Sequence, residues 1–159
     1  MPMNPKDNSD HPHVIALPPI IFCGCVGLSV LAHYIHPLRV TAYPGLRPAG
    51  VLLAAASGSF AIWAVRVFRA NGTNVHPNRP TVALVRTGPY RFTRNPMYLS
   101  LCALQLALGL ILDDWIVLLF AVPLALILHY GVISREESYL EAKFGEPYRA
   151  LKREVRRWV

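Results

Sequence analysis

The stretch Met97–Ile133 reads MYLSLCALQLALGLIL-DD-WIVLLFAVPLALILHYGVI and decides the fold of the chain. Its arms, Met97–Leu112 and Trp115–Ile133, contain no Asp, Glu, Lys or Arg, and only Asp113 and Asp114 separate them. About 20 apolar residues cross a bilayer core of roughly 30 Å, so each arm is predicted to be a transmembrane helix, the first one short. A connection this tight predicts an antiparallel helical hairpin.

Two further runs, Val14–Ile35 and Pro48–Val65, also lack charged residues. The 159-residue chain is 53% hydrophobic and 16% charged, with a mean hydropathy of +0.35, which is not the balance of a soluble globular domain. We therefore predict an all-α integral membrane protein with four transmembrane helices. One domain over residues 14–159 follows a mobile tail, residues 1–13. A cleaved signal peptide is the alternative for Val14–Ile35, which its weakly basic flank and the lack of an Ala-x-Ala site disfavour.

Basic residues predict the orientation of these helices. They concentrate in the second connection, from Arg66 to Arg94, and in the C-terminal segment from Arg135 to Arg157. The positive-inside rule places both segments in the cytoplasm and, with four spans, the N-terminus as well. A basic collar against anionic headgroups explains the net charge of +7. A nucleic-acid partner is not expected, because no soluble domain remains to carry one.

Polar and aromatic residues flank the hairpin, in Gly88–Tyr98 and in Arg135–Trp158. The hairpin returns the chain to the same membrane face and so places Arg91–Tyr98 near Arg135–Glu137. The start of the third helix also offers backbone N–H groups to an anionic group. The two glutamates of the second segment are either a solvated helix end or carboxylates that hold ribose hydroxyls or an ammonium group.

Three other patterns complete the prediction. Gly50, Ala54 and Gly58 form a stripe of small residues on which another helix can pack closely. The connection between Phe68 and Met97 is long, lacks regular secondary structure and is more often functional than idle at such a length. The last segment is amphipathic, and we expect it to lie on the membrane surface or to fold over the site. Its apolar positions are Tyr139, Leu140, Phe144, Tyr148, Leu151 and Val155.

The flanking segments carry two motifs. The first is Val85-x-x-Gly88-Pro89-Tyr90-x-x-x-Arg94-Asn95-Pro96-Met97-Tyr98, and the second is Glu136-Glu137-x-x-Leu140-x-x-x-Phe144-Gly145-Glu146-x-Tyr148-x-x-Leu151-Lys152-x-x-Val155-x-Arg157-Trp158. Together they resemble the superfamily of isoprenylcysteine carboxyl methyltransferases and phospholipid methyltransferases. Members are integral-membrane enzymes that use S-adenosylmethionine. The resemblance covers about residues 71–159, so this part of the chain is expected to bind the cofactor. The protein is expected to lie in a bacterial inner membrane, with its active site on the cytoplasmic face.

The resemblance implies the cofactor-binding residues, whereas His76, Arg135 and Glu137 are candidates proposed beside it. The acceptor is expected to be a small lipophilic molecule or lipid, methylated on a carboxyl, amine or thiol. Arg135 and Glu137 are the expected substrate-binding residues. The expected catalytic residues are Arg94, Asn95, Tyr98 and, as a candidate base, His76. The expected cofactor contacts are Val82, Ala83, Leu84, Val85, Tyr90, Asn95, Pro96, Met97, Tyr98 and Glu136; no metal is expected.

The chain differs from the eukaryotic prenylcysteine enzymes at two positions. Asn95 stands where they have a histidine, and Val132 stands where they have an arginine, so the acceptor stays open. Two other function classes also stay open. One is an NADPH-dependent sterol-type reductase, for which Arg149, Lys152 and Arg153 would hold the 2′-phosphate. The other is a non-catalytic membrane adaptor.

Overall fold

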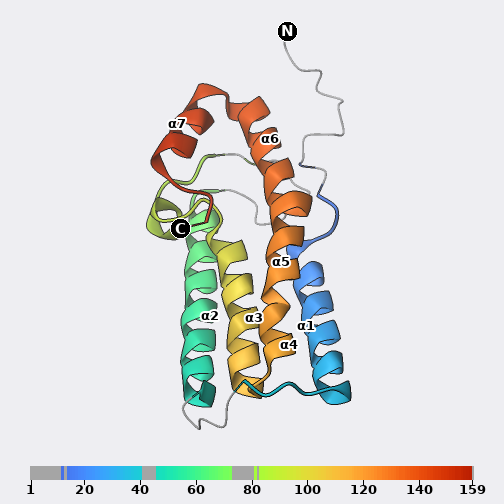
Figure 1. The fold of residues 1–159 in the computed structure, drawn as a ribbon. Coiled ribbons are helices and arrows are strands. Elements are labelled where there is room, and N and C mark those ends of the chain that lie inside the picture. Colours follow the sequence, from blue (N-terminus) through green and yellow to red (C-terminus); the bar gives the residue numbers. More distant parts are fainter. Residues whose placement is uncertain (1–11, 13, 41–45, 73–80, 82, 159) are drawn as a thin grey trace.

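The structure is a computed structural model that describes residues 12, 14–40, 46–72, 81 and 83–158. Every regular element in these ranges is helical (Figure 1). In chain order the elements are α1 (Pro18–Ile35), α2 (Leu46–Ala70), the 3₁₀ turn η1 (Gly88–Arg91), α3 (Pro96–Leu112), α4 (Trp115–Leu119), α5 (Ala121–Ile127), the π-helix η2 (Leu128–Ile133), α6 (Ser134–Phe144) and α7 (Glu146–Glu154).

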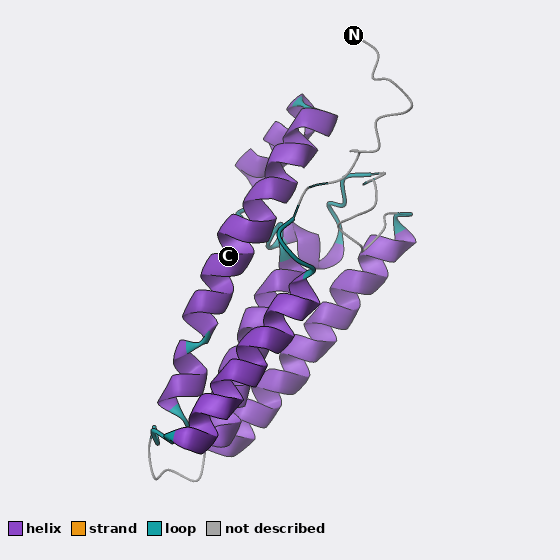
Figure 2. Ribbon diagram, turned by 90° about the vertical axis from the view of Figure 1, so that its right-hand side faces the viewer, coloured by secondary structure: helices purple, strands orange, loops and turns teal. Residues whose placement is uncertain are grey.

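The long helices run side by side in a bundle (Figures 1 and 2). Three helical stretches are long and apolar enough to cross a membrane: α1, α2 and the nearly continuous helix Trp115–Phe144, whereas α3 is a shorter apolar helix. Large apolar side chains such as Leu28, Leu31 and Leu52 are more than half exposed on the bundle surface. Such a surface is typical of helices that face lipid. The predicted all-helical fold is confirmed for the described residues, and three of the four predicted transmembrane stretches are long enough to span a bilayer. The predicted hairpin is formed by α3 and the helix that follows it.

The interface between α2 and α3 depends on small side chains. The buried positions of α2 are Gly50, Ser57 and Ala64, each one heptad from the next, as in left-handed helix packing. A Cβ added at Gly50 would lie 2.9 Å from the Ala107 carbonyl oxygen, so α3 approaches here as predicted. The prediction of close helix packing was wrong at Gly58, where an added Cβ would meet no atom within 4 Å.

These two glycines give a matched pair of substitutions. We expect Gly50→Ala to lower the free energy of unfolding by about 1–3 kcal/mol, because the new methyl group would push the backbone of α3 away. Gly58→Ala should be neutral or stabilise by up to about 1 kcal/mol through helix propensity. Thermal unfolding of both variants in detergent checks this, and equal effects at the two positions would contradict the packing described.

Asp114 joins α1 to the hairpin at one end of the bundle. Its Oδ1 accepts hydrogen bonds from the N–H groups of Ile116 (2.7 Å) and Val117 (3.2 Å) and so caps α4. Its Oδ2 accepts the N–H of Leu38 (2.8 Å) and lies 2.8 Å from Nδ1 of His33. The side chain is fully buried. One carboxylate therefore fixes both the start of α4 and the end of α1.

The opposite end of the bundle holds the beginning of α3 and the end of the long helix. There, α6 passes into α7 through Gly145, whose φ of +58° is a conformation that favours glycine. After α7, the chain turns back toward the first turn of α3, as its hydrogen bonds to residues 93–95 demonstrate. This return brings the C-terminal segment Arg156–Trp158 to the motifs identified in the sequence.

Candidate functional site

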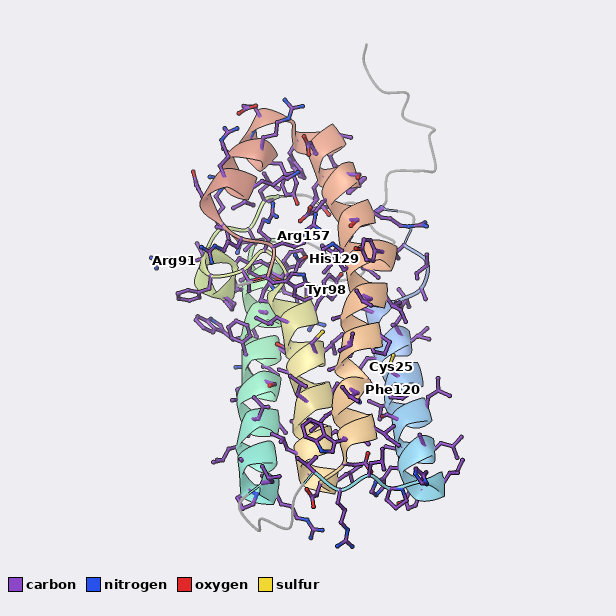
Figure 3. All side chains as sticks on the ribbon, viewed as in Figure 1. Cys25, Arg91, Tyr98, Phe120, His129 and Arg157 are labelled. Carbon is purple, nitrogen blue, oxygen red and sulfur yellow. The ribbon has the colours of Figure 1, made fainter. Side chains whose placement is uncertain are left out.

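A cavity lies at this end of the bundle. Its volume of about 110 Å³ is several times the roughly 10–15 Å³ that one water needs, so it is not a small packing defect. Figure 3 shows Tyr98, His129 and Arg157 gathered at the same end of the bundle, far from Phe120. The lining residues are Pro12, Phe68, Thr81, Ala83, Leu84, Val85, Tyr90, Arg94, Asn95, Pro96, Met97, Tyr98, Glu136, Glu137, Tyr139, Leu140, Tyr148 and Leu151.

The first contact across the cavity joins the two arms of the hairpin. Tyr98, in the first turn of α3, donates its hydroxyl to Oε1 of Glu136, in the first turn of α6, at 2.7 Å. Tyr98 is buried, with 8% of its surface exposed. The predicted meeting of Arg91–Tyr98 with Arg135–Glu137 is thereby confirmed.

The second contact is an ion-pair network in which Arg94 and Arg157 both bind Glu137. Arg94 places Nη2 3.1 Å from Glu137 Oε1, and the exposed fractions of the two side chains are only 10% and 7%. Arg157 donates Nε to the same oxygen (3.0 Å) and Nη2 to Oε2 (2.5 Å). Hydrogen bonding to Glu137 also raises the pKa of the Arg157 guanidinium. Both oxygens of Glu137 are thus engaged by arginines.

Backbone carbonyls of the C-terminal segment Arg156–Trp158 bind the residues before α3. The carbonyl of Arg157 accepts hydrogen bonds from Thr93 Oγ1 (3.0 Å) and from Asn95 Nδ2 (2.9 Å). The carbonyl of Arg156 accepts the Arg94 N–H at 3.0 Å. Asn95 occupies the N-cap position of α3 without a capping hydrogen bond from its side chain. Its amide holds the C-terminal segment instead.

Trp158 and His129 anchor this segment to the bundle. The Trp158 Nε1–H points at His129 Nδ1 (3.3 Å), and their rings stack with an interplanar angle of 15°. Arg157 Nη1 lies 2.8 Å from His129 Nε2. The Trp158 ring also packs against the apolar cluster that contains Tyr98 and Val132. His129 belongs to the π-helix η2, a kind of bulge that is common at functional sites.

Three buried donor atoms at the cavity have no hydrogen-bond partner within the described part of the chain. They are the Tyr90 hydroxyl and the Nε and Nη1 atoms of Arg94. A buried donor without a partner costs about 1–3 kcal/mol, and more when it is charged. Burial, together with the charge of Glu136, raises the pKa of Tyr90, so its hydroxyl keeps its proton. Tyr90 and Arg94 both line the cavity, so an anionic group bound beside them would satisfy donors that the described residues leave unpaired.

Most of the residues named from the sequence line this cavity. Arg135 does not, because its side chain is exposed on α6. His76 and Val82 lie outside the described residues, as does the predicted N-terminal tail apart from Pro12, which lines the cavity. Arg157 and Trp158 belong to the second sequence motif, but sequence reasoning gave them no role in the site and did not connect them with His129.

The basic side chains on α7 do not reach the cavity. Arg149 and Lys152 each lie 3.0 Å from Glu141, and Arg153 lies 2.6 Å from Glu146, all on exposed surface. These were the residues expected to hold the 2′-phosphate of NADPH. Their charges are neutralised within the chain, so the structure does not favour the reductase alternative.

Comparison with known proteins gives two matches. The family model described as phospholipid methyltransferase matches residues 46–147. A protein from Haemophilus influenzae, described as uncharacterized, is 44% identical over 63 residues, which is all of that protein and 40% of this chain. The family match covers α2, both halves of the hairpin and most of the cavity residues. It confirms the superfamily that the two sequence motifs indicated.

Proposed function

The chain belongs to the phospholipid methyltransferase family, and from this we propose that it is an integral-membrane methyltransferase dependent on S-adenosylmethionine. Its acceptor is a small lipophilic molecule or lipid that reaches the cavity from the bilayer. We further propose four membrane spans, with α3 as the short one at about 25 Å. The cavity and both termini would then face the cytoplasm of a bacterium, as the distribution of arginines supports.

The buried donors without partners carry this proposal. The methionine part of the cofactor ends in a carboxylate, which needs two or three N–H or O–H donors when it is buried. Nε and Nη1 of Arg94 and the hydroxyl of Tyr90 have no partner in the described residues, and both residues line the cavity. The donor set therefore fits the carboxylate of S-adenosylmethionine. The first turn of α3, which lacks a side-chain cap, adds a positive dipole end.

Other cavity residues fit the remaining parts of the cofactor. The Glu136 carboxylate, held by Tyr98, would accept hydrogen bonds from the ammonium group or from ribose hydroxyls. Apolar lining residues would cover the adenine ring. We propose the stretch Val82–Val85 and the residues Asn95, Pro96 and Met97 as its further contacts.

When bound, S-adenosylmethionine supplies a methyl group on a positively charged sulfur. The chain has to orient that group toward the acceptor and exclude water, which accounts for most of the catalysis in such transfers. Tyr98, whose hydroxyl is fixed by Glu136, presents a ring suited to a sulfonium. Asn95 cannot take up a proton near neutral pH, so a base for an amine or thiol acceptor would come from elsewhere. We propose His76 for that role and Arg135 as a substrate-binding residue.

Methyl transfer tests the proposal directly. The purified protein is incubated with methyl-labelled S-adenosylmethionine and a lipid extract, and label is expected in an organic-soluble product. Glu136→Gln should reduce the rate by at least about tenfold, because an amide, which has one acceptor oxygen in place of two, replaces the carboxyl group at the cavity. The control is Glu146→Gln, on the exposed surface of α7. No labelled product with any lipid fraction, or equal rates for both variants, would count against the proposal.

A further inference from the structure

Arg157 occupies a position that cofactor binding alone does not explain. Its guanidinium contacts Glu137 on α6 and His129 on η2, while its carbonyl holds Thr93 and Asn95 on either side of Arg94. Arg157 thus contacts α6, η2 and the residues on both sides of Arg94. Arg94 itself shares Glu137 Oε1 with Arg157, at 3.1 Å and 3.0 Å.

This sharing decides which atoms of Arg94 are free. A carboxylate paired with one arginine normally takes two of its N–H groups side by side. Here Arg157 already holds both oxygens of Glu137, so only Nη2 of Arg94 binds Glu137, whereas its Nε and Nη1 are left without partners in the described residues. Without Arg157, Glu137 would be a nearly buried carboxylate with one arginine, and it would pull that arginine into a two-pronged pair. The donors at the cavity would then be lost to the ligand.

We propose that Arg157 is a positioning residue for the cofactor carboxylate: it occupies Glu137 and thereby keeps Nε and Nη1 of Arg94 available at the cavity. The C-terminal segment Arg156–Trp158 acts as a latch that sets this arrangement, with Trp158 as its anchor. The inference rests on the proposed function, because it assigns the Arg94 donors to the carboxylate of the cofactor.

Two ligands separate positioning from a general structural role. S-Adenosylhomocysteine carries the amino-acid carboxylate and ammonium groups, whereas 5′-methylthioadenosine has the same nucleoside and sulfur without either. Arg157 contacts Glu137 and not Glu136, so a loss that depends on Arg157 reports on the carboxylate side. Binding of each to the detergent-purified full chain is measured by calorimetry for the wild type, Arg157→Ala and Arg157→Lys. Arg156→Ala is the matched control, because the Arg156 side chain is exposed and its carbonyl bond to Arg94 survives the change.

For Arg157→Ala we expect the affinity for S-adenosylhomocysteine to fall by about tenfold or more, and that for 5′-methylthioadenosine by less than about threefold. Arg157→Lys keeps the positive charge but loses the paired N–H groups that bind both oxygens of Glu137. Its loss of affinity for S-adenosylhomocysteine should therefore be smaller than that of Arg157→Ala. If Arg157→Ala does not fold, the lysine variant carries the test. Equal losses for both ligands, or no loss for either, would overturn the latch. Wild-type protein that binds neither ligand would instead refute the proposed function itself.

Discussion

Replacing Arg94 by methionine is expected to weaken the binding of S-adenosylhomocysteine by about 100-fold or more. Each hydrogen bond from a charged group contributes about 1.5–3 kcal/mol, and this change removes two donors, Nε and Nη1, from the cavity. About 1.4 kcal/mol corresponds to tenfold in affinity. The fold should survive, because Arg157 still holds both oxygens of Glu137. Calorimetric titration of the purified variant measures the effect.

The matched control is Arg91→Met, at a position three residues before Arg94. The side chain of Arg91 is exposed in η1 and does not line the cavity. We expect its affinity to stay within about twofold of the wild type, since exposed charges contribute little. If both arginine variants lose affinity equally, the loss reflects general positive charge at the membrane surface, and Arg94 has no specific role.

The second large effect is on stability, at the end of the bundle away from the cavity. Asp114→Ala is expected to lower the free energy of unfolding by about 3–5 kcal/mol, because it removes a helix cap and leaves the facing donors of Leu38 and His33 without an acceptor. The melting temperature in detergent should fall by at least about 6 °C. Once folded at low temperature, the variant should still bind the cofactor.

The neighbouring Asp113 supplies the control for this prediction. Its φ of +54° is a left-handed conformation that asparagine also tolerates, so Asp113→Asn should change the melting temperature little. If Asp114→Ala also melted within a degree or two of the wild type, the carboxylate would not join α1 to the hairpin. Together the two variants separate the role of the cap from the charge of the acidic pair.

The hairpin and the half of the site that it forms could be predicted from the sequence. An uninterrupted apolar run, a two-residue acidic break and a second run leave few other arrangements, and the break requires both ends to meet. The hairpin therefore predicted that Tyr98 lies near Glu136, and in the structure the Tyr98 hydroxyl is 2.7 Å from Glu136 Oε1. The bounds of α2 were less accurate, because its basic ends extend a helix beyond its apolar part.

The C-terminal latch could not be predicted for a physical reason. Two of its bonds end on the carbonyl of Arg157 and one on that of Arg156, and a carbonyl is the same for every residue type. The π-helix η2 was equally hidden, since the apolar run through it has no break in hydropathy. The seven-residue spacing of Gly50, Ser57 and Ala64 was not predicted, because small residues also recur every four positions up to Gly58. At Gly58 an added Cβ would meet no atom within 4 Å.

Titration of the purified wild-type protein with S-adenosylhomocysteine and 5′-methylthioadenosine tests the central claim most directly. We predict saturable binding of one molecule per chain for both ligands, competitive with each other. S-Adenosylhomocysteine should bind more tightly, because only it has a carboxylate for Arg94 and Tyr90 and an ammonium group for Glu136. Absence of saturable binding for either ligand would contradict a cofactor site in this cavity, and equal affinities would contradict the role given to the buried donors.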